Sequence, residues 1–172
     1  MIACKNHGLC WPISIAMIIA SHLFIAGVMA TQVADTIIKA RVAYVIDGDS
    51  IMTRYEGRFL EVRLWGIDAP EYNQPGGENA KHRLKKLVEG NVINLTIKDR
   101  DKYGRMVALV SSGGQIVNEE MVRTGNSWVY DYYCREQICS DWVRLEEKAR
   151  RDGIGLWKNR SPIPPWRWKS DT

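Results

Sequence analysis

Apolar and polar positions alternate along five stretches of the chain, a period of two that is typical of strands with one buried face. These stretches are residues 37–46, 51–55, 59–67, 92–98 and 105–110. Glycine-containing turns separate the first three stretches, and the charged segment "DRDKYG" separates the last two. The pattern therefore predicts five strands, of which the first three follow one another closely.

A second period, close to 3.6 residues, begins after the polar loop "DAPEYNQPGG". It predicts a helix over residues 78–90 that stops at Gly90, and another over residues 140–151 that stops at Gly153. Between them, "GGQIVNEEMVRTG" predicts a turn, a short strand and a short helix ending at Gly125. Five strands with interspersed helices in 172 residues indicate a small closed barrel of the α+β class, mainly β.

The first thirty residues differ from the rest of the chain. They hold one formal charge, Lys5, followed by the apolar run "WPISIAMIIASHLFIAGVMA". This arrangement is typical of a secretory signal, and the small residues Val28 and Ala30 predict cleavage after Ala30. An uncleaved membrane anchor is the alternative, because residues 11–30 approach the roughly 20 needed to cross a bilayer. Either way the pattern predicts an exported protein, periplasmic or secreted.

The cysteine positions agree with export. Cys4 and Cys10 lie in the signal segment, and Cys134 and Cys139 remain in "CREQIC". In an oxidising compartment such a pair closes a small local disulfide, and we predict this bond. Two unpaired thiols are the alternative.

Several kinds of site are excluded by composition. His82 is the one histidine after Ala30, and its position predicts a solvated residue on a helix. A histidine-rich zinc site is therefore unavailable, and so is a usual Ser-His-Asp triad unless His82 serves in it. The net charge of +4 is too small to indicate a partner by itself. What remains for chemistry is a set of carboxylates and arginines near predicted strand ends.

Two carboxylates stand out among these groups. In "VIDGDSI", Asp47 and Gly48 predict a hairpin turn, because glycine accepts a positive φ at no steric cost. Asp49 is then a second carboxylate that the turn does not need, and Asp68 ends a later strand. Two such groups repel unless a cation lies between them, and oxygen ligands favour Ca²⁺ or Mg²⁺ over zinc. The alternative is that both are solvated turn residues.

Arg63 lies inside a predicted strand, so its side chain points opposite to those of Val62 and Leu64. Its guanidinium either pairs with a buried carboxylate or binds a ligand phosphate, unless this face is simply solvated. A divalent ion, arginines and a spare carboxylate together suit the cleavage of a phosphodiester.

The motifs "VIDGDSI", "VRLWGIDAPE", "DKYGR", "GGQIVNEEMVRTG" and the closing "GLW" occur in this order. From residue 39 to residue 157 the chain resembles the staphylococcal (thermonuclease-like) nucleases. The resemblance implies an OB-fold five-stranded barrel with about three packed helices, spanning residues 37–157. It also implies a calcium-dependent phosphodiesterase that acts on DNA and RNA and leaves 3′-phosphates.

The resemblance assigns metal-binding roles position by position. Asp49 and Asp68 match the calcium carboxylates, and Ala69 matches a residue that offers its backbone carbonyl. That position is usually Thr in the family, so a hydroxyl is lost while the carbonyl remains. Ser50 replaces the commoner Thr after the first motif.

The resemblance also assigns catalytic and substrate-binding roles. Arg63 matches the arginine that grips the phosphate, and Glu71 the carboxylate that activates water. Arg105 matches the second arginine, which stabilises the transition state or the leaving oxygen. Lys102 and Tyr103 match residues that contact a terminal nucleotide phosphate.

We expect nucleic acid to be bound mainly through its backbone, hence with salt sensitivity and little sequence preference. Tyr103 and the aromatic residues of the segment 128–133 are candidates for stacking on unpaired bases, which favours single-stranded or fraying regions; core packing is the alternative for that segment. The tail segment, residues 158–172, is Pro-rich and basic and is expected to be extended. Its "PPWRWK" either touches nucleic acid or a membrane surface, or folds against the barrel.

We expect a monomer with no small-molecule cofactor. Two other functions compete with the nuclease hypothesis: a non-catalytic OB-fold module and an envelope- or polysaccharide-associated protein. The feature that favours the enzyme is the presence of all five charged site residues: Asp49, Arg63, Asp68, Glu71 and Arg105.

Overall fold

The computed structural model describes residues 36–170. The predicted signal, residues 1–30, lies outside the described residues, as do Cys4 and Cys10. Among the described helices none is long and apolar enough to span a bilayer.

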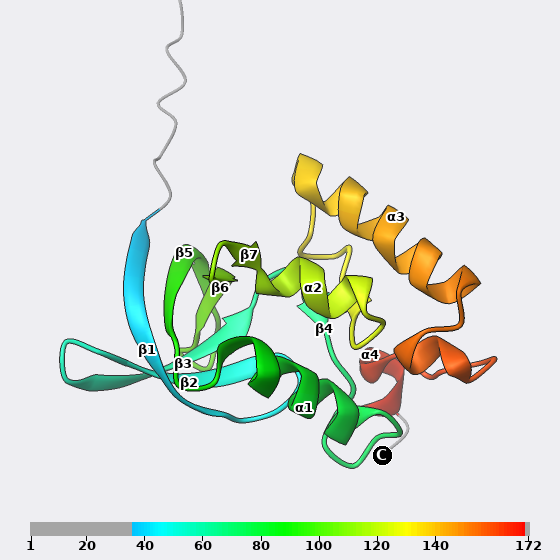
Figure 1. The fold of residues 1–172 in the computed structure, drawn as a ribbon, viewed down its shortest axis with the longest axis horizontal. Helices are drawn as coiled ribbons and strands as arrows, with labels where there is room; N and C mark the ends of the chain where they lie inside the picture. Colours follow the sequence, from blue (N-terminus) through cyan, green and yellow to red (C-terminus); the bar gives the residue numbers. More distant parts are fainter. Residues whose placement is uncertain (1–35, 171–172) are drawn as a thin grey trace, which may run out of the picture. The chain divides into compact units, whose positions relative to one another are not determined.

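In the described part of the chain, five strands close into a barrel (Figure 1). They are β1 (Ile37–Val45), β2 (Ser50–Tyr55), β3 (Arg58–Leu64), β5 (Val92–Arg100) and β6 (Met106–Ser112). Neighbours in the order β3-β2-β1-β5-β6 pair antiparallel, and a parallel pairing of β3 with β6 completes the closure. The predicted five-stranded OB-fold barrel is confirmed.

Three short strands accompany the barrel. Strand β7 (Gln115–Ile116) extends the sheet beyond β6, and β4 (Ile67–Asp68) pairs with β8 (Trp128–Val129). The stretch predicted as one strand over residues 59–67 is thus divided, because Gly66 adopts a left-handed conformation with φ 74°. This break redirects the chain, so that Asp68 belongs to a separate two-stranded ribbon.

Helices α1 (Gly77–Val88), α2 (Val117–Arg123) and α3 (Gln137–Arg151) cover the barrel, followed by the short helices η1 (Gly155–Lys158) and α4 (Pro165–Trp168). Each longer helix buries one apolar face, for example Ala80, Leu84 and Val88 in α1. His82 is exposed on α1, as predicted. Buried Asn118 of α2 accepts from the Val110 amide and donates to the Trp65 carbonyl, which ties this helix to the barrel.

The tail segment differs from the extended conformation that the sequence predicts. Residues 165–168 form the helix α4, in which Pro165 is the first residue and is buried. Proline suits this position because its fixed φ is helical and its missing N–H would be unpaired there. Trp166 stacks on Tyr130 with ring centroids 5.4 Å apart and packs edge-on against Trp128. Aromatic contact with the barrel therefore folds a segment whose composition alone indicates a loop.

The structure joins Cys134 to Cys139 in a disulfide. Both side chains are buried, and that of Cys134 lies beside Gly66. We expect replacement of both cysteines by alanine to lower the free energy of unfolding by about 2 kcal/mol, the chain-entropy value for so short a loop. Equilibrium unfolding in urea measures this change. A reducing agent is expected to lower the stability of the wild type by a similar amount and to leave the double variant unchanged. Equal stability of the two proteins under oxidising conditions would contradict the prediction.

Candidate active site

Asp49, Arg63 and Asp68 form one buried charged cluster. Arg63 donates from Nη1 to Asp49 Oδ1 at 2.9 Å and from Nη2 to Asp68 Oδ1. Ser50 pairs with Arg63 across β2 and β3, and the Leu64 amide donates to the Asp49 carbonyl at 2.8 Å. Strand register therefore sets Asp49 beside Arg63, and the break after β3 brings Asp68 to the other side of the guanidinium.

The turn before β2 aims Asp49 into this cluster. Asp47 Oδ1 accepts the Asp49 amide at 3.0 Å, an Asx-turn that gives Asp47 the predicted turn role. The predicted positive φ at Gly48 is wrong, since Gly48 lies outside the left-handed region. A Cβ at Gly48 would lie 2.7 Å from the Cβ atoms of Ala69 and Ala80. Glycine is needed here because the turn passes close to α1 and to the site loop.

The cluster carries an excess of negative charge. Burial, and then the charge of Asp49, raises the pKa of Asp68 to about 6, an effect that Arg63 offsets only in part. The pKa of Asp47 rises to about 6 for the same two reasons. Burial tends to lower the pKa of Arg63, but the charges of Asp49 and Asp68 outweigh burial and raise it. The balance of charge favours an additional cation at this site.

The donor chemistry suits a hard divalent ion. Within residues 36–170 no three His, Cys, Asp or Glu side chains converge as a metal-binding set. Asp49 and Asp68 nevertheless offer buried carboxylate oxygens, and the Ala69 amide donates to Asp49 Oδ2 at 2.8 Å, which brings the Ala69 backbone to the cluster. Calcium accepts carboxylate, carbonyl, water and phosphate oxygens together, so few protein ligands are sufficient. The residues present fit such an ion.

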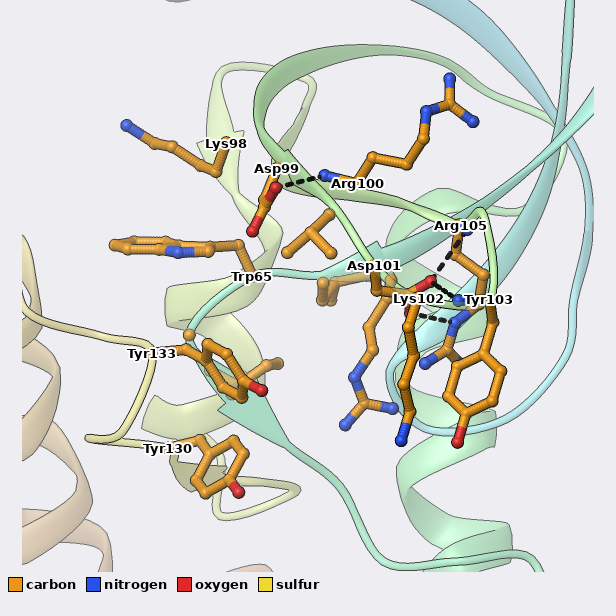
Figure 2. Close-up of a pocket in the computed structure, with 15 residues that line it drawn as sticks. Trp65, Lys98, Asp99, Arg100, Asp101, Lys102, Tyr103, Arg105, Tyr130 and Tyr133 are labelled. Atoms are coloured by element: carbon orange, nitrogen blue, oxygen red, sulfur yellow. Dashed lines mark hydrogen bonds and ion pairs between the residues drawn. The ribbon is translucent and has the colours of Figure 1, made fainter.

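A cavity of about 510 Å³ opens beside this cluster and is shown in Figure 2. Its lining includes Arg63 and Arg105, together with Lys102 and Tyr103. Across the cavity from Lys102, Tyr103 and Arg105 lie the aromatic side chains of Trp65, Tyr130 and Tyr133 (Figure 2). The two predicted arginines thus line one hollow, which also holds aromatic rings.

Arg105 is oriented by a residue that sequence reasoning had not assigned. Its Nε donates to Asp101 Oδ2 at 2.7 Å, and its backbone amide donates to Asp101 Oδ1. Burial tends to raise the pKa of Asp101, but the hydrogen bonds from Arg105 outweigh it and lower the pKa. The side chains of Lys102 and Arg105 also approach the ring of Tyr103. The i,i+4 spacing of Asp101 and Arg105 was the available sequence signal.

The aromatic residues of the segment 128–133, which were predicted to stack on bases, differ in their exposure. Trp128 is buried against Trp157, so core packing describes this residue. Tyr132 and Tyr133 are exposed, and Tyr133 lines the cavity with Tyr130. Tyrosines rather than Trp128 are therefore available to bases.

Glu71 lies outside the cavity lining, in the loop between β4 and α1. Its Oε1 accepts from Lys169 Nζ at 2.6 Å, and Lys169 is also within electrostatic range of Asp68. Its backbone amide donates to the side chain of buried Gln74. The structure therefore joins Asp49, Arg63 and Asp68 directly, and connects Glu71 to them through Lys169.

Comparison with known proteins shows the family of the chain. The family model described as staphylococcal nuclease homologue matches residues 61–159. The chain belongs to this family. A protein named "Uncharacterized endonuclease" from Escherichia coli O157:H7 is 38% identical over 133 residues, covering 77% of this chain and 85% of the relative. A "Micrococcal nuclease" from Shigella flexneri is 34% identical over 140 residues, covering 76% of this chain and 80% of the relative.

A third relative, an "Uncharacterized endonuclease" from Haemophilus influenzae, is 37% identical over 130 residues, or 75% of this chain and 71% of that protein. As a staphylococcal nuclease homologue the chain is a hydrolase of the nuclease class, and its substrates are nucleic acids. Most of the tail segment, residues 160–172, follows the part that the family model matches.

Proposed function

We propose that the chain is a calcium-dependent nuclease that hydrolyses DNA and RNA with little sequence specificity and leaves 3′-phosphates. The observation that supports this most is the arrangement of the arginines. Arg63 and Arg105 line one cavity, and Arg63 is held between two buried carboxylates. Cations fixed beside a phosphate stabilise the charge that grows on its oxygens during displacement.

Each group has a role in this proposal. Asp49, Asp68 and the Ala69 carbonyl would hold calcium, which would supply positive charge beside the phosphate. Glu71 accepts a proton from the attacking water as the new P–O bond forms. Arg63 binds the equatorial oxygens, and Arg105 neutralises the 5′ oxygen as its bond to phosphorus breaks. The departing oxygen takes a proton from solvent, and Glu71 then releases its proton to solvent, so atoms and charges balance.

Lys102 and Tyr103 line the cavity, and in this proposal they bind an adjacent phosphate. Tyr133, which is 58% exposed, offers a ring face to an unpaired base. These features support a preference for single-stranded or fraying nucleic acid. A buried disulfide between Cys134 and Cys139 supports the proposal of export, since such bonds persist in oxidising compartments.

The metal requirement is tested by assaying nuclease activity with chelator and with added ions. Chelation is expected to abolish cleavage of single-stranded DNA, and excess calcium to restore it, with magnesium less effective because it demands a tighter octahedral site. Analysis of the product ends is expected to show 3′-phosphates. Undiminished cleavage in excess chelator would contradict the metal assignment.

A further inference from the structure

The tail segment contacts the loop that carries Glu71 in two places. Lys169 Nζ donates to Glu71 Oε1 at 2.6 Å. Separately, the Ile163 carbonyl accepts from Gln74 Nε2, and Gln74 Oε1 accepts the Glu71 amide at 3.1 Å. Both the side chain and the backbone of Glu71 are therefore connected to the tail segment.

Aromatic packing holds the tail segment at this position. Trp166 stacks on Tyr130 and packs edge-on against Trp128, and Pro165 is buried. The Trp168 indole donates to Asn73, which lies in the same loop as Glu71. In Figure 1, α4 lies next to the loop before α1. These contacts hold Lys169 beside Glu71 in one defined geometry. The ion pair therefore does not depend on the free motion of two long side chains.

Glu71 needs such support because of its surroundings. It lies in an irregular loop, its side chain is 34% exposed, and no strand or helix fixes its direction. A general base acts only when its oxygen lies within hydrogen-bond reach of the water that it deprotonates. An ammonium group on Oε1 orients the carboxylate and leaves Oε2 for that water.

We propose that Lys169 is a positioning residue of the nuclease. The tail segment holds Lys169 in place, and Lys169 orients Glu71 toward the attacking water. The inference depends on the role given to Glu71 under the proposed function. It concerns residues beyond the match to the family model, which ends at residue 159. The ammonium of Lys169 is also within electrostatic range of Asp68 and Arg63, so the tail segment adds a cation near the charged cluster.

The test compares three variants of the full chain by steady-state kinetics on single-stranded DNA. Lys169→Met removes the ammonium and keeps the apolar stem, while Lys169→Arg keeps the charge. Arg167→Met removes a matched charge from an exposed position on α4, the short helix that ends just before Lys169. We expect Lys169→Met to lower kcat by about 10- to 100-fold with little change in KM, because a misplaced catalytic group costs this much. Lys169→Arg is expected to recover most of kcat, and Arg167→Met to match the wild type.

The outcomes separate this inference from the proposed function. Glu71→Gln is assayed in parallel, and its retained activity would mean that the base itself is wrongly assigned. If Glu71→Gln is inactive while Lys169→Met keeps the wild-type kcat, only the positioning role of Lys169 is refuted. A rise in KM without a fall in kcat identifies Lys169 as a phosphate contact and overturns the positioning role. A rise in kcat identifies the ion pair as inhibitory and overturns it as well.

Discussion

Replacing Glu71 by glutamine, or Arg105 by alanine, is expected to lower kcat by at least about 10²–10³-fold, the cost of losing one preorganised catalytic group. Glutamine keeps the size of Glu71 but cannot accept a proton from water. Alanine at position 105 removes the cation that lines the cavity beside Arg63. Rates of DNA cleavage at saturating substrate and calcium measure both effects.

Both variants are expected to lose activity and to keep the wild-type fold. Glu71 pairs with half-exposed Lys169, and Arg105 with Asp101 near the surface, and such ion pairs contribute about 0–1 kcal/mol. Glu78→Gln, a matched change at an exposed position in the first turn of α1, serves as the control. Wild-type rates in both purified variants would refute the catalytic assignment.

Replacing Arg63 by alanine is expected to lower the free energy of unfolding by about 3–5 kcal/mol near pH 7 in the presence of a chelator, because Asp49 and Asp68 are then buried without their partner. Arg58→Ala removes the same charge from an exposed position on the same strand and is expected to change stability little. Urea unfolding of both variants gives the comparison.

The loss of unfolding free energy in Arg63→Ala is expected to be smaller at lower pH. The pKa of Asp68 is already raised to about 6 with Arg63 present, and removing that cation raises it further. An acid whose pKa is raised on folding stabilises the fold below its ordinary pKa and loses this contribution as the pH rises through the raised value. Near pH 5 the Arg63→Ala variant therefore approaches the wild type. Calcium is expected to narrow the gap at neutral pH, since a ligand of the folded state stabilises it. A gap independent of both pH and calcium would show that Arg63 does not neutralise the cluster.

Local sequence signals were sufficient for the strands and the longer helices. The alternation around residues 51–55 and the helical period around residues 140–151 reflect neighbours two or four positions apart, which any fold with those elements must place together. The strand pattern also indicated that Arg63 faces away from Val62 and Leu64. Its pairing with Asp49 then follows from the register of β2 and β3.

Other features depended on contacts that no local pattern contains. Gly48 looked like a positive-φ turn residue, but the space it occupies is limited by Ala69 and Ala80. The tail segment looked extended, because its prolines and basic residues favour loops, yet Trp166 folds it against Tyr130.

By itself, then, the sequence determined the strands, the longer helices and the identity of the charged groups, because periodicity is a property of neighbouring residues. The order of its motifs indicated the barrel through the family resemblance. Only the tertiary structure decided that Lys169 meets Glu71 and that Asp101 orients Arg105 at the cavity. The first of these contacts joins parts of the chain far apart in sequence, and the second depends on how a short turn directs two side chains. The first is determined by tertiary packing, which composition and spacing do not encode. For the second, the i,i+4 spacing was a signal, but only the folded turn fixes the direction of the two side chains.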